Sequence, residues 1–318
     1  MPSISFIPNM EHKRFSPLLV GFTLLVTLTI LAWLVALYFF SKPEKPFDGN
    51  RALKDLNIQV GFGPRIPGSP AHQETINYIM SELRNAGWNV TIYKQLINGN
   101  YAYNILATRN SMMPIILLGA HYDSRIYADN DPIPENKTRA VPGANDGASG
   151  VAVLLEIARS LPVSSADTAL LFIDIEDNGN ITGWDWIQGS KAFAESMVIQ
   201  PKAVVIIDMI GDKDLNIFME KNSDTELTHQ LWKTAKTLGY ASNFIPEYKY
   251  QVLDDQIPFL EKGFRAVDII DLDYEYWHTT KDTADKVSAS SLQKVGDTLL
   301  AWIRDYGPCL KLQNCAAE

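Results

Sequence analysis

Apolar runs and amphipathic segments alternate along most of the 318-residue chain. Uninterrupted runs of Val, Ile and Leu predict strands that are buried on both faces, and apolar residues spaced three and four apart predict helices. Strands are expected at residues 115–120, 169–175, 203–210 and 264–271, after a hairpin at 89–93 and 101–107. Helices are expected at residues 51–60, 71–86, 147–160, 189–197, 225–238 and 288–305. This alternation predicts an α/β fold with a mixed, mostly parallel sheet covered by helices on both faces.

The apolar segment at residues 16–40 differs from these runs because it contains no charged residue and has no polar face. Its length is sufficient to cross a bilayer as a helix, and no small-residue cleavage motif follows it. We therefore predict a single-pass membrane protein with a cytoplasmic tail at residues 1–15 and an anchor at 16–40. A linker at 41–50 would lead to an extracytoplasmic domain at 51–318.

The net charge of the chain is −9 at pH 7, and it becomes more negative when the amino-terminal segment with Lys13 and Arg14 is left out. Nucleic-acid phosphates repel such a surface, so nucleic acid is excluded as a partner. Anionic lipid headgroups repel it as well, which leaves the apolar helix as the membrane attachment. The only two cysteines, Cys309 and Cys315, could form a disulfide in an oxidising compartment or remain free thiols.

Residues able to bind metal stand at the carboxyl ends of three predicted strands. The first strand leads to His121, the second to Glu176 and Asp177, and the third to Asp208. Because parallel strands end at the same edge of a sheet, these side chains are expected to lie close together. Asp146 stands at the predicted start of a helix, in the segment PGANDGASG, where a metal ligand and a helix N-cap are equally good interpretations.

A later cluster adds His278, and together these residues predict a zinc site, since buried charges need metal or each other for compensation. Carboxylates mixed with histidines suit Zn²⁺, although Mn²⁺ and Co²⁺ accept the same ligand types. The candidate ligands are His121, Asp146, Asp177, Asp208 and His278. If Asp146 bridges, each of two zinc ions has three protein ligands, and a water molecule forms the other bridge.

Two further carboxylates would assist this centre. Glu176 neighbours a ligand and is expected to be the general base, which takes a proton from the water and returns it to the leaving amine. Asp123 is expected to hold the second imidazole nitrogen of His121. Adjacent strand residues point to opposite faces of a sheet, so Glu176 and Asp177 reach one centre only if the strand end is kinked.

Substrate contacts are expected from Asp254, Trp277 and Trp184. Trp186 could line the pocket as well, although aromatic residues at a sheet edge are as often packing residues. Two other histidines, His72 and His229, lie on predicted helices without acidic neighbours in the sequence. We interpret these two histidines as surface or helix-packing residues.

The segments GAHYDS, PGANDGASGVA, FIDIEDNG, IDMIG and WHTTKDT, in this order and at these spacings, resemble the co-catalytic zinc aminopeptidases of the bacterial leucyl aminopeptidase and aminopeptidase Y type. The resemblance covers about residues 50–305 and implies a single three-layer α/β/α sandwich. It also implies the five metal ligands and the general base named above, and peptide substrates with a free amino terminus. Many members have Glu where this chain has Asp177, which is expected to alter the site slightly.

The glutaminyl cyclases, a sibling branch of the same fold, are similar to the chain in DDQIPF, in the pair Trp277-His278 and in a tryptophan-containing insert at 183–190. The chain departs from them at Gln256, where they have a histidine, and around Asp273, where they have an aromatic residue.

The cyclase resemblance implies a different chemistry, because these enzymes use one zinc ion and cyclise an amino-terminal glutamine without attack by water. The zinc ligands would be Asp146, Asp177 and His278. Glu176 would carry the proton, and Asp208 and Asp254 would form an acidic hydrogen-bond network.

From the sequence, a membrane-anchored aminopeptidase with two zinc ions is the preferred interpretation, and the single-zinc cyclase is the alternative. A non-catalytic receptor domain of the same fold is a third interpretation. It is less favoured because all five ligand positions and Glu176 carry residue types competent for their roles.

Overall fold

The computed structural model describes residues 26–27, 29–30, 46–109, 113–163, 165 and 167–312. The chain divides into two compact units, Met1–Glu44 and Lys45–Glu318. Nearly all of the anchor expected at 16–40 lies outside the described residues. In the part of the chain that is described, no helix is long and apolar enough to span a membrane.

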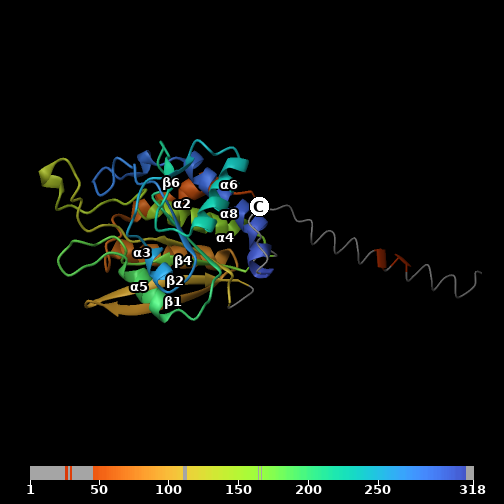
Figure 1. Cartoon of the computed structure of the whole chain (residues 1–318). Coiled ribbons are helices and arrows are strands. Elements are labelled where there is room, and N and C mark those ends of the chain that lie inside the picture. The colour runs from red at the N-terminus through yellow and green to blue at the C-terminus, as the bar shows by residue number, and fades with distance from the viewer. Residues whose placement is uncertain are drawn as a thin grey trace, which may run out of the picture. The chain divides into compact units, whose positions relative to one another are not determined.

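A six-stranded sheet forms the centre of the second unit (Figure 1). The strand order is β1-β2-β4-β3-β5-β8, in which β2 runs antiparallel to both of its neighbours and the remaining pairs are parallel. The strands are β1 (Asn89–Ile97), β2 (Asn100–Thr108), β3 (Ile116–His121), β4 (Thr168–Ile173), β5 (Ala203–Asp208) and β8 (Ala266–Ile270). The prediction of a mixed, mostly parallel sheet in an α/β fold is confirmed.

Helices cover both faces of this sheet. The α-helices are α2 (Gly49–Phe62), α3 (Pro70–Asn85), α4 (Ala148–Ser160), α5 (Gln188–Ser196), α6 (Thr225–Thr237), α7 (Ile257–Glu261) and α8 (Ala289–Leu312). Two short 3₁₀ turns, η1 (Pro134–Asn136) and η2 (Ala284–Lys286), lie in loops.

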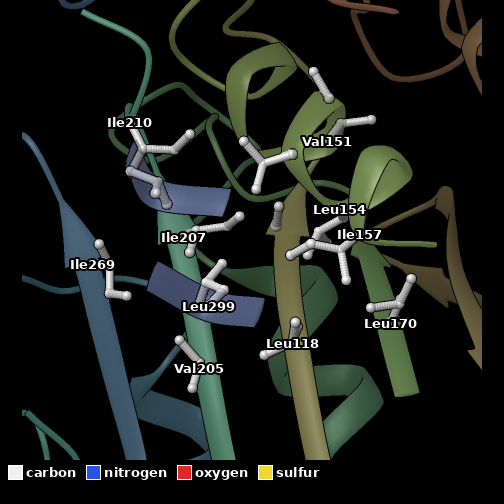
Figure 2. Packing of buried hydrophobic residues seen from close by; sticks show 14 of the residues in the cluster. Leu118, Val151, Leu154, Ile157, Leu170, Val205, Ile207, Ile210, Ile269 and Leu299 are labelled. Atoms are coloured by element: carbon white, nitrogen blue, oxygen red, sulfur yellow. The ribbon is translucent and has the colours of Figure 1, made fainter. Parts of the chain in front are cut away.

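Strand β3 shows how the two faces arise, because its successive side chains point to opposite sides. Leu118 belongs to the larger apolar cluster, which includes Leu154 of α4 and Leu299 of α8 (Figure 2). Leu117 packs in a second cluster with Phe193 of α5 and Phe259 of α7. The sheet therefore forms the middle layer between two helical layers.

Several boundaries differ from those expected from the sequence. Strand β4 ends at Ile173, two residues before the expected end, because Ile175 adopts a left-handed backbone conformation with a φ of 53°. Helix α8 continues to Leu312 and includes Pro308. Cys309 is disulfide-bonded, whereas Cys315 lies outside the described residues.

A two-stranded parallel sheet of β6 (Ile217–Met219) and β7 (Phe244–Tyr248) was not expected. Strand β6 has only three residues, which is too short for a periodic pattern to stand out in the sequence.

Candidate metal centre

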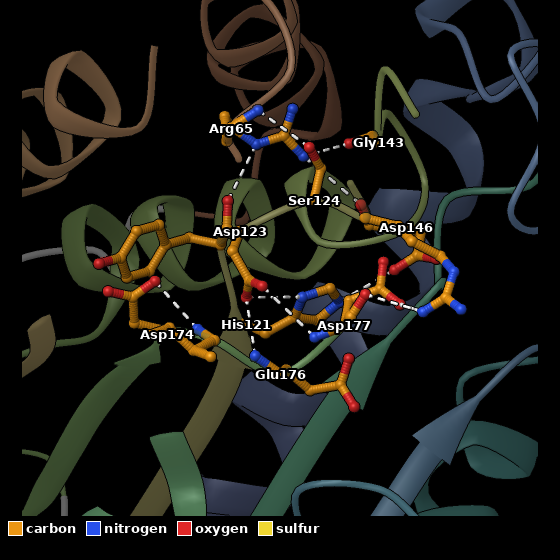
Figure 3. Close-up of polar contacts among 12 residues, drawn as sticks. Arg65, His121, Asp123, Ser124, Gly143, Asp146, Asp174, Glu176 and Asp177 are labelled. Atoms are coloured by element: carbon orange, nitrogen blue, oxygen red, sulfur yellow. Dashed lines mark hydrogen bonds and ion pairs between the residues drawn. The ribbon is translucent and has the colours of Figure 1, made fainter. Parts of the chain in front are cut away.

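The metal centre lies at the carboxyl ends of the three neighbouring strands β4, β3 and β5 (Figure 3). His121 is the last residue of β3, and Asp208 is the last residue of β5. Glu176 and Asp177 follow the end of β4, and Asp146 lies shortly before the start of α4. The structure thus brings together side chains that the sequence separates by many residues.

Two groups of buried side chains could each hold a metal ion, and they share Asp146. In the first group, His121 Nε2 lies 3.1 Å from Asp146 Oδ1 and 3.1 Å from Asp208 Oδ1. In the second group, His278 Nε2 lies 2.9 Å from Asp177 Oδ1 and 3.6 Å from Asp146 Oδ2. All five predicted ligands therefore converge, and the shared residue is the one expected to bridge.

The second group has the chemistry that a zinc ion requires. Asp146 Oδ2, Asp177 Oδ2 and His278 Nε2 are buried, and within the described part of the chain none of them has a hydrogen-bond partner. A buried polar atom without a partner is costly, and zinc binds carboxylate oxygen and imidazole nitrogen. These three residues fit a zinc ion.

The first group is partly satisfied by its own contacts: Asp208 has no unpartnered buried oxygen, whereas His121 Nδ1 and Asp146 Oδ2 lack hydrogen-bond partners among the described residues. His121 Nε2 shares a hydrogen bond with Asp208 Oδ1, which also accepts one from Met209 N at 2.7 Å. A metal would compete with these contacts. The second group is therefore the stronger candidate for a tightly held ion.

Glu176 and Asp177 face the same centre because the chain turns sharply after β4. The left-handed Ile175 produces the kinked strand end that the adjacent acid pair required, so this prediction is confirmed. The Asp123 carboxylate then accepts hydrogen bonds from Glu176 N at 3.1 Å and Asp177 N at 3.3 Å. Asp123 Oδ1 lies 3.5 Å from His121 Nδ1, so its closer contacts are with the turn and not with the imidazole.

Asp282 holds the loop that carries Asp146. Its carboxylate accepts hydrogen bonds from Asn145 N at 2.8 Å, from Asp146 N at 3.2 Å and from the Tyr274 hydroxyl at 2.6 Å. No role was expected for Asp282 from the sequence, although this residue belongs to the segment WHTTKDT that supplies His278.

Arg65 is a second residue that the sequence did not reveal. Its guanidinium is fully buried and donates to the carbonyl oxygens of Tyr122 at 2.9 Å and Pro142 at 2.8 Å. Burial lowers the pKa of Arg65, although neighbouring carboxylates such as Asp282 oppose this effect. Arg65 follows a proline in a turn-rich segment, where nothing in the sequence indicates its distant partners.

The centre carries an excess of buried negative charge. Burial raises the pKa of Glu176 well above its usual range, and the charges of Asp254 and Asp177 act in the same direction, against His121. Burial and the charge of Asp146 raise the pKa of Asp177 to about 6, although His278 opposes them. A bound cation would relieve this repulsion, which agrees with the unpaired ligand atoms.

A cavity of about 230 Å³ opens onto the centre. It is lined by Asp146, Glu176, Asp177, Trp186, Asp208, Met209, Gln251, Val252, Leu253, Asp254, Ile270, Leu272, Trp277 and His278. Two of the residues expected to contact substrate, Asp254 and Trp277, are in its wall. The third, Trp184, is not, and Trp186 takes its place with its ring stacked on His278 at a centroid distance of 5.8 Å. The sequence alone could not show which of these two tryptophans, two positions apart in one loop, lines the cavity.

Comparison with known proteins adds a family and two kinds of relative. A family model described as peptidase family M28 matches residues 104–303. The glutaminyl-peptide cyclotransferase of Bothrops jararaca is 25% identical over 289 residues, covering 76% of this chain and 77% of that protein.

Two solved structures are similar over most of the fold. A Zn-dependent exopeptidase from Parabacteroides distasonis has a TM-score of 0.78 and 29% identity, covering 82% of this chain and 99% of that chain. A glutaminyl cyclase from Bacteroides thetaiotaomicron, bound to N-acetylhistamine, has a TM-score of 0.77 and 30% identity over the same shares. The chain is thus similar both to a zinc exopeptidase and to glutaminyl cyclases.

Proposed function

The chain belongs to peptidase family M28, a zinc-dependent family, and from this premise we propose that it is a glutaminyl-peptide cyclotransferase. The observation that carries the proposal is the group of Asp146, Asp177 and His278, in which each residue has a buried ligand atom without a hydrogen-bond partner among the described residues. A single zinc ion satisfies all three residues. The cyclotransferase of Bothrops jararaca and the cyclase of Bacteroides thetaiotaomicron support the same choice. The sequence-based preference for an aminopeptidase rested on the count of five candidate ligands and on motifs, and we now prefer the cyclotransferase to it.

Zinc held by these three residues would polarise the side-chain amide carbonyl of an amino-terminal glutamine. Glu176 borders the cavity and would take a proton from the α-amino nitrogen as that nitrogen attacks the amide carbon. Glu176 would return this proton to the side-chain amide nitrogen, which leaves as ammonia. One carbon–nitrogen bond forms, one breaks, and no water is consumed.

Two other features of the cavity suit this reaction. Asp208 and Asp254 line it beside Glu176 and would accept hydrogen bonds from the substrate's α-amino group. Trp186 and Trp277 form part of its wall, and their apolar surfaces would limit the entry of competing water. An amino-terminal glutamine offers the amine and amide that these two kinds of surface match.

A second candidate function is hydrolysis by an aminopeptidase with two zinc ions. The observation that favours it is the first metal group of His121, Asp146 and Asp208, which shares Asp146 with the second. The similarity to a Zn-dependent exopeptidase supports it as well. Glu176 would then take its proton from the attacking water and give it to the leaving amine.

A substrate comparison distinguishes the two reactions. Zinc-loaded protein is incubated with a peptide that begins with glutamine and, separately, with leucyl arylamide. We expect ammonia and a cyclised peptide of unchanged length from the first substrate, and no arylamine from the second, as measured by mass spectrometry and absorbance. Release of arylamine or free glutamine without cyclisation would favour the aminopeptidase, and inactivity on both substrates would reject both functions.

A further inference from the structure

A buried histidine–aspartate pair lies beside the metal centre but outside its ligand set. His72 on α3 is 2% exposed, and its Nε2 lies 2.7 Å from Asp174 Oδ1. Of the two interpretations offered for His72, the surface one is wrong and the helix-packing one agrees with its burial, but the acidic partner was not expected. Its acidic partner is 102 residues away in the sequence, so no local pattern could have indicated the pair.

Asp174 is fixed at the residue before the kink. Its Oδ1 accepts a hydrogen bond from Ile175 N at 2.9 Å, and its Oδ2 accepts one from Tyr103 N at 2.8 Å. Its own backbone N donates to Asn104 Oδ1 at 3.0 Å. These contacts hold the chain in place where it leaves β4.

His72 also links the ends of two neighbouring strands. Its ring stacks on Tyr122 with a centroid distance of 5.3 Å and an interplanar angle of 26°. Tyr122 directly follows His121 at the end of β3, and its backbone N donates to Ile173 O, the last residue of β4, at 2.9 Å. The His72 imidazole thus contacts Tyr122, the residue after β3, and the carboxylate of Asp174, the residue after β4.

The kink needs such support because a β-branched residue with positive φ is unfavourable. Ile175 is in this conformation, with Asp174 held on one side and the Glu176 and Asp177 amides held by Asp123 on the other. We propose that His72 and Asp174 are positioning residues that keep this turn in the geometry from which Glu176 reaches the substrate. The inference deepens the proposed function and rests on the role of Glu176 in it, which is the same for cyclisation and for hydrolysis.

Two substitutions at one position test this proposal. His72→Gln keeps an N–H donor for Asp174, whereas His72→Phe keeps a ring on Tyr122 and removes the donor. Loss of a residue that orients a functional group typically costs about 10–100-fold in activity. We expect His72→Phe to lower kcat by this factor with little change in KM, and His72→Gln to restore most of the rate. His229→Gln, at an exposed histidine on α6, is the control and should behave as wild type.

A zinc measurement separates this proposal from the proposed function. The same turn carries Asp177, so His72→Phe should also bind zinc more weakly than His72→Gln in competition with a chelating dye. If the wild-type protein neither cyclises nor hydrolyses any substrate, the proposed function fails. The difference in zinc affinity between the two variants still tests the positioning role in that case. Should His72→Phe fail to fold, Asp174→Asn is expected to show the same losses. The proposal is overturned if His72→Phe keeps wild-type kcat and zinc affinity, or if His72→Gln is impaired as much as His72→Phe. When His72→Phe does not fold, wild-type kcat and zinc affinity in a folded Asp174→Asn overturn it instead.

Discussion

At the residue scale, the centre combines acids that differ in what surrounds them. Asp146 and Asp177 have carboxylate oxygens without hydrogen-bond partners among the described residues, whereas Asp123 and Asp282 accept several backbone N–H groups. The first kind of carboxylate is available to a cation, and the second kind fixes the loops that present it. Glu176 has neither of these roles. It borders the cavity but belongs to neither metal group.

The role of Glu176 is tested by Glu176→Gln, which keeps the shape of the side chain and removes its basic oxygen. A general base typically contributes about 10²–10⁴-fold, so we expect a rate loss of that order with normal zinc content. Steady-state kinetics and elemental analysis measure the two quantities. Glu195→Gln, at an exposed glutamate on α5, is the matched control. Near-normal turnover in Glu176→Gln would rule out its part in proton transfer.

The number of zinc ions is tested by comparing Asp146→Asn with His121→Asn. Asp146 belongs to both metal groups and His121 only to the first. For the cyclase we expect one zinc per wild-type chain, retained by His121→Asn and lost from Asp146→Asn. Elemental analysis of protein shown to be folded by circular dichroism gives the stoichiometry. Two zinc ions in wild type, with one lost on His121→Asn, would instead support the aminopeptidase.

The pair of His72 and Asp174 also predicts a dependence of stability on pH. Burial lowers the pKa of His72, but the hydrogen bond to Asp174 and the charges of Asp174 and Asp123 outweigh burial and Arg65, so the pKa is raised. A raised histidine pKa stabilises the fold fully below the unfolded-state value of about 6.5, and this contribution disappears as pH rises through the folded-state value.

Thermal unfolding of wild type and His72→Gln at several pH values measures this contribution. The deficit in Tm of His72→Gln should be largest in acid and should shrink as the pH becomes alkaline. A deficit that is constant with pH, or that grows in alkali, would show that the protonated imidazole contributes nothing to stability.

At the element scale, the sequence predicts what local patterns determine. The apolar runs of β3, β4 and β5 are long enough to be recognised, and their carboxyl ends place His121, Asp177 and Asp208 at one edge. The need for a kink also follows from the adjacent acids Glu176 and Asp177. For these reasons the sheet and the convergence of the ligands could be predicted.

The supporting contacts could not be predicted, because they depend on packing between distant segments. Arg65 donates to backbone carbonyls that any residue could supply, and Asp282 accepts from backbone amides. The contact of Asp174 with His72 joins residues that are 102 positions apart in the sequence. Partner identity in these cases is a property of the folded chain and leaves no periodic or local signal.

Helix α5 meets the kink directly, and a glycine allows this approach. Gly189 N donates to Ile175 O at 3.3 Å, and a Cβ at Gly189 would collide with the backbone oxygen of Asp174. Overpacking of this kind typically costs about 1–3 kcal/mol. Gly189→Ala should therefore lower both Tm and kcat, since the displaced turn carries Glu176.

Gly61→Ala is the matched control for this substitution, because Gly61 is an exposed residue of α2 with open space at the Cβ position. Alanine is a better helix former than glycine, so the Tm of Gly61→Ala should stay the same or rise slightly. Equal Tm and activity in the two variants would mean that the α5 contact does not constrain the turn.

At the scale of the whole molecule, the catalytic part has its own core. The compact unit Lys45–Glu318 contains the two apolar clusters described above, and Phe47 near its start is buried in the larger one, which also contains residues of α8. The predicted membrane anchor at 16–40 belongs to the other unit. Separation of the two units in the chain predicts that removal of the first leaves the fold and the site of the second intact.

The anchor is then tested by comparing the full chain with a chain that begins at Pro46. The full chain should stay with the membrane fraction after an alkaline carbonate wash, because an uncharged helix of this length is stable in the bilayer and requires detergent for extraction. The chain from Pro46 should be recovered without detergent and keep wild-type kcat. Protease added to intact cells should digest the domain of the full chain, since it is expected outside the cytoplasm. Full protection would reverse the predicted orientation, and recovery of the full chain without detergent would reject the anchor.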